Sequence, residues 1–293
     1  MGGIYNRGVP RPLRVLRDLE RGEWELIDAR PDRALRPHVV RYTGWFERRA
    51  TPLQRRELPS QYIPLIINFG SAIRVSRAAD PARRDSFGSF TTGAYDSYVL
   101  VETDAGAGGI QVDFTILGAR RFLGIPLDGV TNRAISLDDI FGRDGQRLTS
   151  ALHDAPSWDD RFDLLDRAIA GQLEAARPLL PEMLWTWERI VRTEGQVSIG
   201  ALSADLGWSR RRLVDRFKED VGLAPKVFAR VLRFHHAVES LKARDSRRLS
   251  DLALDCGYYD QAHFDRDFRV FSGVTPTELV RTLRPDGGFA AEA

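Results

Sequence analysis

The spacing of apolar and polar positions changes near the middle of this chain. Between Leu35 and about Gly118, short apolar runs rich in Val, Ile, Tyr and Phe are separated by Gly, Pro, Asp and Ser. Such runs are typical of strands joined by turns. The predicted strands read VVRYTGWF, YIPLIINFG, SYVLVE and GIQVDFTIL. We therefore expect a small β-barrel or sandwich, and little core from the arginine-rich residues 1 to about 35.

Helical spacing begins at Arg161, after which apolar residues recur at the intervals of one helix face. A further helix is predicted from Pro181 to Gly195, and no strand pattern returns after it. The class is therefore α+β. We expect a β-rich domain, cupin-like or a small barrel, over residues 1–180, with linker helices at its end. An all-α domain is expected over 182–284, and a flexible tail over 285–293.

The last hundred residues contain an internal duplication. Gly207 and Gly257 are 50 residues apart, and five further pairs are 51 apart: Leu213 and Phe264, Phe217 and Phe268, Lys218 and Arg269, Gly222 and Gly273, Pro225 and Pro276. In each copy a glycine turn separates a short helix from a second helix, which is the arrangement of a helix-turn-helix. We expect the second helices to begin after the N-cap residues Ser209 and Asp260.

One long helix is predicted between the two copies, from Pro225 to Arg244. Eighteen residues of helix span about 27 Å. Such a connection could set the two second helices about one turn of DNA apart, roughly 34 Å, so that they enter successive major grooves. The geometry favours a monomeric DNA reader.

Composition and charge limit the other classes. Hydrophobic residues make up 43% and charged residues 29% of the chain, which is close to the average for soluble proteins. With a single cysteine, Cys256, the chain can form neither an internal disulfide nor a multi-cysteine metal site. We therefore expect a cytoplasmic protein without a metal or cofactor. The net charge of +2 is uninformative, but residues 210–218 form the sharpest basic cluster.

No arrangement of catalytic residues is found in the sequence. The N-terminal part contains only His38 and His153 as histidine ligands, and no G-x-S-x-G motif occurs. We therefore expect no enzyme.

The residues of the duplication resemble the DNA-binding domain of AraC/XylS-type transcriptional regulators. The second copy, GYYDQAHFDRDFRVFSGVTP, is similar to the signature of that family at nearly every position, and the resemblance covers about Val197 to Arg284. It implies double-stranded DNA as partner. RNA polymerase and a second copy of this chain are further partners consistent with it.

The resemblance also implies which residues face DNA, on the second helix of each copy and in the basic cluster: Arg210, Arg211, Arg212, Val214, Asp215, Arg216, Lys218, Gln261, Ala262, His263, Asp265 and Arg266. Arg211 suits guanine and Gln261 suits adenine. Asp215 departs from the family, where many members carry arginine. An aspartate there could accept from cytosine N4, or it could weaken binding by repelling phosphate.

The role of the N-terminal domain stays open between two alternatives. It could sense a small apolar or aromatic effector, because the predicted β-domain is rich in aromatic residues. Alternatively, it only mediates dimerisation or protein interaction, and the regulator is independent of ligand.

Overall fold

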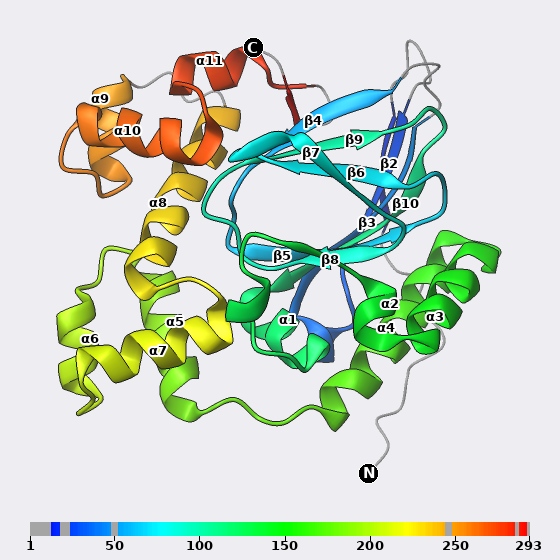
Figure 1. The fold of residues 1–293 in the computed structure, drawn as a ribbon, viewed down its shortest axis with the longest axis horizontal. Coiled ribbons are helices and arrows are strands. Elements are labelled where there is room, and N and C mark those ends of the chain that lie inside the picture. Colours follow the sequence, from blue (N-terminus) through cyan, green and yellow to red (C-terminus); the bar gives the residue numbers. More distant parts are fainter. Residues whose placement is uncertain (1–12, 18–23, 48–51, 244–247, 285–286, 292–293) are drawn as a thin grey trace.

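The computed structural model describes residues 13–17, 24–47, 52–243, 248–284 and 287–291 of this chain. It has a β-rich N-terminal domain and a helical C-terminal domain, which lie side by side (Figure 1).

Two antiparallel sheets form the N-terminal domain. The larger sheet has the order β1 (Leu13–Arg17), β2 (Trp24–Ala29), β3 (Val39–Glu47), β10 (Gly108–Thr115), β5 (Tyr62–Asn68), β8 (Phe90–Thr92), β11 (Ala134–Ser136). The smaller sheet has the order β12 (Phe289–Ala290), β4 (Leu53–Glu57), β9 (Val99–Thr103), β6 (Ile73–Arg77), β7 (Asp80–Phe87). The expected β-rich domain is therefore confirmed.

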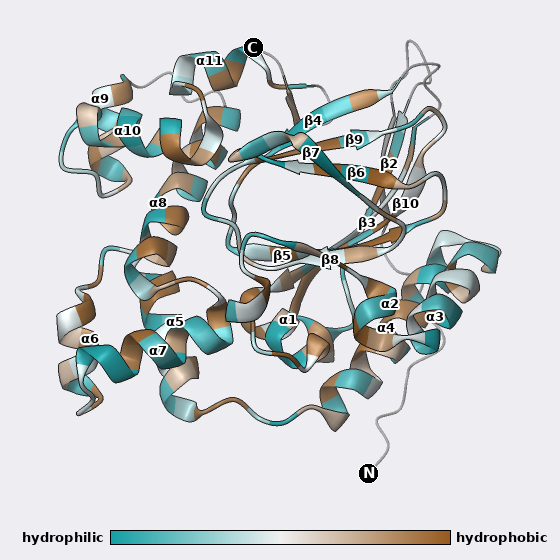
Figure 2. Cartoon of the chain, viewed as in Figure 1, coloured by the Kyte–Doolittle hydropathy of each residue, from teal (hydrophilic) through white to brown (hydrophobic). Residues whose placement is uncertain are grey.

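Alternation along β5 divides the hydrophobic residues of this domain into two groups, because successive residues of a strand point to opposite faces. Ile63, Leu65 and Ile67 are fully buried in the main core, which continues into the helices. Ile66 points the other way and packs against a smaller cluster between the sheets. That cluster contains residues of β6, β8 and β9: Ile73, Val75, Phe90 and Val99. Figure 2 shows apolar and polar residues alternating along the strands and helices of both domains.

Four helices cover the larger sheet on the side away from the smaller sheet: α1 (Ile116–Leu123), α2 (Leu137–Phe141), α3 (Arg143–Asp154), α4 (Trp158–Ala175) (Figure 1). Two short 3-10 helices, η1 (Arg33–Leu35) and η2 (Asp128–Val130), complete the domain. Only α4 was expected from the helical spacing. Helix α1 begins directly at the end of β10, where the Thr115 hydroxyl accepts from the Gly118 N–H, so the apolar run GIQVDFTIL contains both a strand and a helix start.

The first 35 residues contribute more to the core than we expected. Strand β2 pairs with β3 in register, and its residues Ile27 and Ala29 are buried together with Leu35. The expectation of little core was therefore wrong for residues 24–35. Their apolar side chains are few but fall on alternate positions, which is all that one buried sheet face requires.

The C-terminal domain contains the remaining helices in the predicted order: α5 (Pro181–Arg192), α6 (Ile199–Asp205), α7 (Arg210–Val221), α8 (Pro225–Lys242), α9 (Leu249–Asp255), α10 (Gln261–Ser272), α11 (Pro276–Arg281). Helix α8 is the long connection between the copies. Phe264 and Phe268 of α10 pack in series with Phe234 of α8, with ring centroids 4.6 and 4.9 Å apart. The second copy is therefore joined to α8 by an aromatic core.

Residues 287–291, the described part of the tail that we expected to be flexible, are ordered against the smaller sheet. Phe289 and Ala290 form β12, which pairs antiparallel with Arg56 and Arg55 of β4. Phe289 is buried, and its ring lies 5.3 Å from the Lys242 ammonium at the end of α8. The C-terminal segment thus fastens the helical domain to the smaller sheet.

Candidate nucleic-acid interface

The second helices of the two copies, α7 and α10, begin and end in the same way. The Ser209 hydroxyl accepts from the Arg212 N–H, and the Asp260 carboxylate accepts from the His263 N–H, so both predicted N-caps are present. The helices end at Gly222 (φ +89°) and Gly273 (φ +77°), which close them with backbone hydrogen bonds to Lys218 and Arg269. Each copy therefore presents one capped helix of twelve residues.

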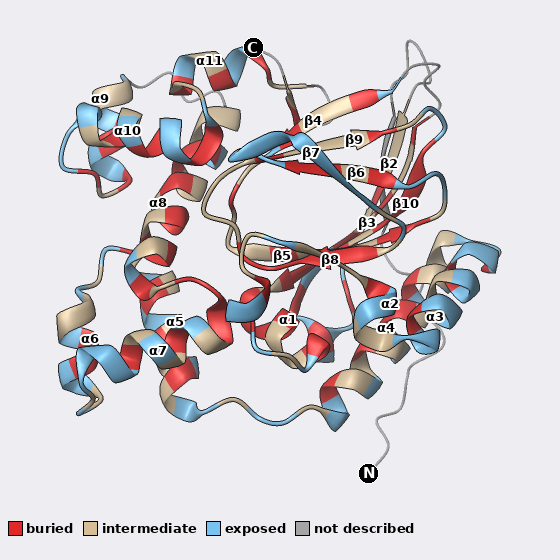
Figure 3. Ribbon diagram, in the orientation of Figure 1, coloured by how far each residue is buried: buried red, intermediate tan, exposed pale blue. Residues whose placement is uncertain are grey.

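Helix α7 exposes most of the residues that the family resemblance places on DNA. The Arg211 side chain is 93% exposed and the Asp215 side chain 67%, and Arg211 Nε lies 3.7 Å from an Asp215 carboxylate oxygen. Arg212 stacks on the Trp208 ring at 4.2 Å. Arg210 and Lys218 are also exposed, and Val214 is half-buried. The exposed face is pale blue in Figure 3.

Arg216 is the member of the basic cluster that turns toward the protein. Its guanidinium pairs with Glu219 at 2.6 Å and lies 3.6 Å from Asp220, whose carboxylate is only 1% exposed. Arg120 of α1 approaches the same carboxylate at 3.2 Å. Burial raises the pKa of Asp220, and the two guanidinium groups oppose that rise. Arg216 therefore belongs to the junction between the domains.

Helix α10 exposes a different set of the predicted DNA-facing residues from α7. Gln261, Ala262 and Arg266 are exposed, while His263 and Asp265 are half-buried. The His263 ring packs edge-on against Tyr258 with centroids 5.2 Å apart. At the position of the repeat where α7 carries Asp215, α10 carries Arg266. The two helices thus offer different chemistry on the same scaffold.

An ion pair that the sequence did not indicate fixes α10 against α8. Arg230 Nη2 donates to Asp267 Oδ1 at 2.7 Å, and Arg230 Nε lies 3.2 Å from both carboxylate oxygens. The Asp267 side chain is 2% exposed. The two residues are 37 positions apart on different helices, so no local spacing could have revealed them.

Both C-terminal glycines dock on the N-terminal domain. The Thr131 hydroxyl donates to the Gly222 carbonyl at 2.7 Å, and a Cβ at Gly222 would also lie 3.6 Å from Ala94. A Cβ at Gly273 would lie 2.5 Å from the Tyr98 ring. Residues 94–98, between β8 and β9, therefore touch the equivalent end of each second helix. We call residues 94–98 the bridging segment.

Arg56 of β4 strengthens the second of these contacts. Its guanidinium donates to the Ser272 carbonyl, donates to the Ala291 carbonyl at 2.6 Å, and lies 4.6 Å from the Tyr98 ring centre. The docked ends of α7 and α10 point toward the N-terminal domain, while their N-terminal turns point away from it (Figure 1). The exposed reading residues are thus left uncovered.

The described residues hold neither a metal cluster nor a membrane span. Within the ranges that the structure describes, no group of three or more His, Cys, Asp and Glu side chains is arranged to hold a metal ion. In the same part of the chain, no helix is long and apolar enough to cross a membrane. Cys256 is buried, as expected for a packing role.

Comparison with protein families assigns the C-terminal region. Residues 202–282 match the model of a helix-turn-helix domain. Uncharacterized HTH-type transcriptional regulators of Staphylococcus aureus are 33% identical over 82 residues, which is 28% of this chain and 11% of theirs. The HTH-type transcriptional regulator MtrA of Neisseria gonorrhoeae is 30% identical over 99 residues, or 34% of this chain and 31% of MtrA. The matches thus span a small part of these relatives.

Solved structures align with a larger part of the chain, but at lower sequence identity. A crystal structure of apo ToxT from Vibrio cholerae aligns with 82% of this chain and 98% of its own, with 12% identity and a TM-score of 0.46. The AraC-like transcriptional activator CuxR aligns with 75% of this chain and 78% of its own, with 15% identity and a TM-score of 0.23. The duplication, its caps and the family match agree on the C-terminal region. Residues 202–282 form a helix-turn-helix domain of the AraC type.

Proposed function

We propose that this protein is a transcriptional regulator that binds double-stranded DNA through α7 and α10 in successive major grooves. The observation that carries the proposal is the pair of equivalently capped helices whose N-terminal turns are exposed. The N-terminal residues of a recognition helix are the ones that contact base edges. The proposed base contacts are made by Arg211 on α7 and by Gln261 and Arg266 on α10.

The test is selection of duplexes from a random library with the full chain, followed by footprinting. We expect protection of two successive major grooves on one face of the DNA. Arg211→Ala and Gln261→Ala should each cost about 1 to 3 kcal/mol on the selected site and relax preference at different base pairs. Equal losses on selected and random DNA would instead make them phosphate contacts, and failure to select any sequence would refute the function.

We further propose that the N-terminal domain controls DNA binding in response to a small apolar or aromatic effector bound between the two sheets. The cluster there is bordered by Trp45, Phe87 and Tyr95. Burial raises the pKa of Tyr95 to about 12, and its hydroxyl is buried without a hydrogen-bond partner. A polar atom of an effector would satisfy that hydroxyl, since an unpaired buried polar group is costly.

The bridging segment supplies the connection that such control requires. Tyr95 packs against the cluster between the sheets, Ala94 adjoins Gly222, and Tyr98 adjoins Gly273. An effector can shift an equilibrium only by binding one state better than the other. A molecule that displaces Tyr95 would alter the contacts of the bridging segment with both α7 and α10. It would therefore bind differently to the state in which these helices are docked on the N-terminal domain and to the state in which they are released.

This second proposal is tested by thermal shift against a metabolite library, with Tyr95→Phe as the comparison. A true effector should raise the melting temperature as its concentration over Kd rises, and it should change DNA affinity. Tyr95→Phe should weaken that response while leaving DNA affinity without effector unchanged. If no compound shifts the melting temperature, and loss of residues 1–180 changes only the oligomeric state, the N-terminal domain mediates assembly.

A further inference from the structure

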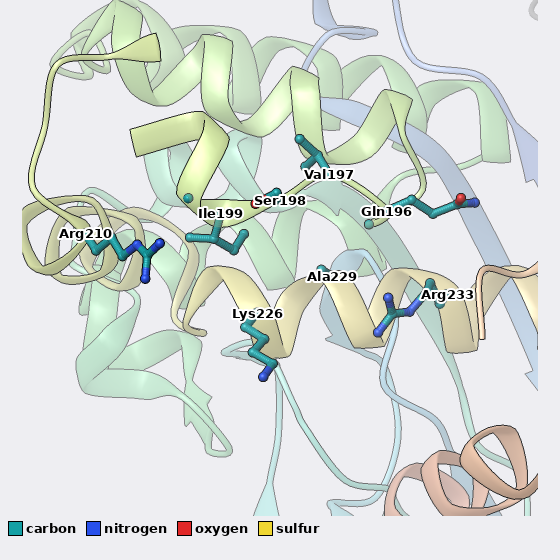
Figure 4. A pocket seen from close by; sticks show the side chains of 10 residues that line it. Gln196, Val197, Ser198, Ile199, Arg210, Lys226, Ala229 and Arg233 are labelled. Carbon is teal, nitrogen blue, oxygen red and sulfur yellow. The ribbon is translucent and has the colours of Figure 1, made fainter. Parts of the chain in front are cut away.

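A basic groove lies between the two helix-turn-helix units, and the predicted DNA-facing residues include only one of its cations. It runs between residues 195–200, which are the end of the loop after α5 and the start of α6, and helix α8 (Figure 4). Its volume is about 420 Å³, and the described residues that line it include Arg210, Lys226 and Arg233 but no acidic residue. We call it the inter-unit groove.

Among the residues that the structure describes, the three cations of the inter-unit groove have no acidic partner. In the described chain, no carboxylate lies within 4.0 Å of Arg210, Lys226 or Arg233, whereas Arg211, Arg216 and Arg230 all have one. The Arg233 Nε is in addition buried without a hydrogen-bond acceptor. An uncompensated cluster of cations favours an anionic ligand, because mutual repulsion and an unpaired donor both cost free energy.

Residues that line the groove belong to the first unit and to α8, and two of them contact the second unit. Arg210 begins α7 and lies over Gly200 of α6, with its Nη2 3.1 Å from the position of a Cβ there. At the other end, Gln196 lies against the turn glycine of the second unit, Gly257, and the Arg233 guanidinium lies 5.5 Å from the Tyr258 ring centre. An anion in the groove would therefore lie beside the start of α7 and next to two side chains, Gln196 and Arg233, that contact the second unit.

The groove also faces away from the N-terminal domain. Lys226, Ala229 and Arg233 are spaced at i, i+3 and i+7, so they form one stripe along α8. His235 follows Lys226 by nine residues, which at 3.6 residues per turn places it roughly 180° around the helix. His235 packs against Tyr62 of β5, with ring centroids 5.7 Å apart. The stripe is thus on the open side of the domain.

The loop that forms the opposite wall is held firmly against α8. Gly195 has φ +76°, and a Cβ there would overlap the Ala229 carbonyl group. Only glycine permits this approach and this backbone conformation. The groove is therefore a preformed feature of the domain.

We propose that the inter-unit groove binds phosphates of the DNA strand that passes between the two major grooves read by α7 and α10. This inference rests on the proposed DNA-binding function. A duplex that fills two successive major grooves must present its backbone to the protein midway between them. Lys226 and Arg233 would each neutralise one phosphate, which positions the duplex without reading sequence.

The experiment compares the full chain with a Lys226→Gln/Arg233→Gln double variant on a selected duplex and on a random duplex. Each phosphate contact contributes about 0.9 to the slope of log Kobs against log salt. We expect the slope to become shallower by about 2 on both duplexes. Between about 50 and 200 mM salt, the variant should accordingly lose about tenfold less affinity than the unchanged chain.

The matched control is Arg143→Gln/Arg167→Gln, which removes the same charge from exposed residues of α3 and α4. Those helices lie on the far side of the N-terminal domain from the DNA-binding helices (Figure 1). We expect the control to keep the original slope. A thermal melt of each variant verifies that it is folded. A groove variant that is folded and keeps the original slope would overturn the proposal, while DNA binding by the unchanged chain would still support the function.

A second arm identifies the source of the phosphate. Methylphosphonate links at the central backbone positions remove the charge of the DNA that the groove would contact. We expect this duplex to weaken binding of the unchanged chain but not of the groove variant, because the same contacts are already absent. If pyrophosphate stabilises the unchanged chain alone, and the methylphosphonate losses are equal in both proteins, the groove binds a free anion and the proposal fails.

Discussion

The ion pair between Arg230 and Asp267 allows a prediction whose size follows from burial. The two partners differ in solvent exposure: the Asp267 side chain is 2% exposed and the Arg230 side chain is 30% exposed. Replacing Arg230 by Met retains much of the side-chain volume but leaves a buried carboxylate without its cation. Removing one partner of a buried pair typically costs about 3 to 5 kcal/mol, because the remaining charge stays desolvated.

The reverse substitution should cost less. In Asp267→Ala the guanidinium can turn toward water, so we expect a loss of about 1.5 to 3 kcal/mol, the range for a hydrogen bond to a charged group. The Arg230→Met/Asp267→Ala double variant should be more stable than Arg230→Met alone by about 1 to 3 kcal/mol, since no buried charge is left. The order of stabilities is the diagnostic feature.

The measurement is equilibrium urea denaturation followed by the helical circular dichroism signal. Arg147→Met is the matched control, because its partner Asp144 is 82% exposed and such surface pairs contribute about 0 to 1 kcal/mol. The reasoning from burial is wrong if Arg230→Met costs no more than this control. It is also wrong if the double variant is less stable than the unchanged chain by the sum of the two single losses.

Three further predictions concern charge, backbone and pH. Asp215→Asn removes an acid beside Arg211, so affinity for random DNA should rise in a filter-binding titration; a fall confined to the selected site would make Asp215 a base reader. Gly222→Ala should lower the melting temperature more than Gly207→Ala, because a Cβ meets the N-terminal domain only at the former, although both have positive φ. The pKa of Glu278 is lowered by hydrogen bonds from the Thr275 backbone N–H and hydroxyl. Its contribution to stability is thus complete above the unfolded pKa and lost as pH falls through the lower folded pKa, and acid titration of Glu278→Gln should lack that loss.

Local patterns in the sequence identified the parts of the fold that depend on neighbouring residues. The N-caps Ser209 and Asp260, the glycines at the ends of α7 and α10, and strands β3 and β5 all follow from short-range spacing. The single long helix between the copies was predicted for the same reason, from Pro225 to Arg244, and in the structure it runs from Pro225 to Lys242.

Contacts between distant residues could not be predicted. Arg216 lies in a basic cluster, yet the buried Asp220 and the half-buried Glu219 hold it in the domain junction. The docking of Gly222 and Gly273 depends on Thr131, Arg56 and the bridging segment, which no helical or strand period connects to the repeat. Lys226 and Arg233 stand singly in the sequence, and only the packing of residues 195–200 against α8 brings them together with Arg210.

The pairing of β12 with β4 has a consequence for the order of synthesis. Arg56 and Phe289 are neighbours across this ladder although the entire helical domain lies between them in the chain. The N-terminal sheets can therefore form on the ribosome while β4 remains an edge strand, and an unpaired edge invites pairing with other chains. Only after the helical domain has been translated does β12 arrive to cover that edge. A nascent chain stalled before β12 would accordingly expose the unpaired edge of β4, which β12 covers in the finished protein.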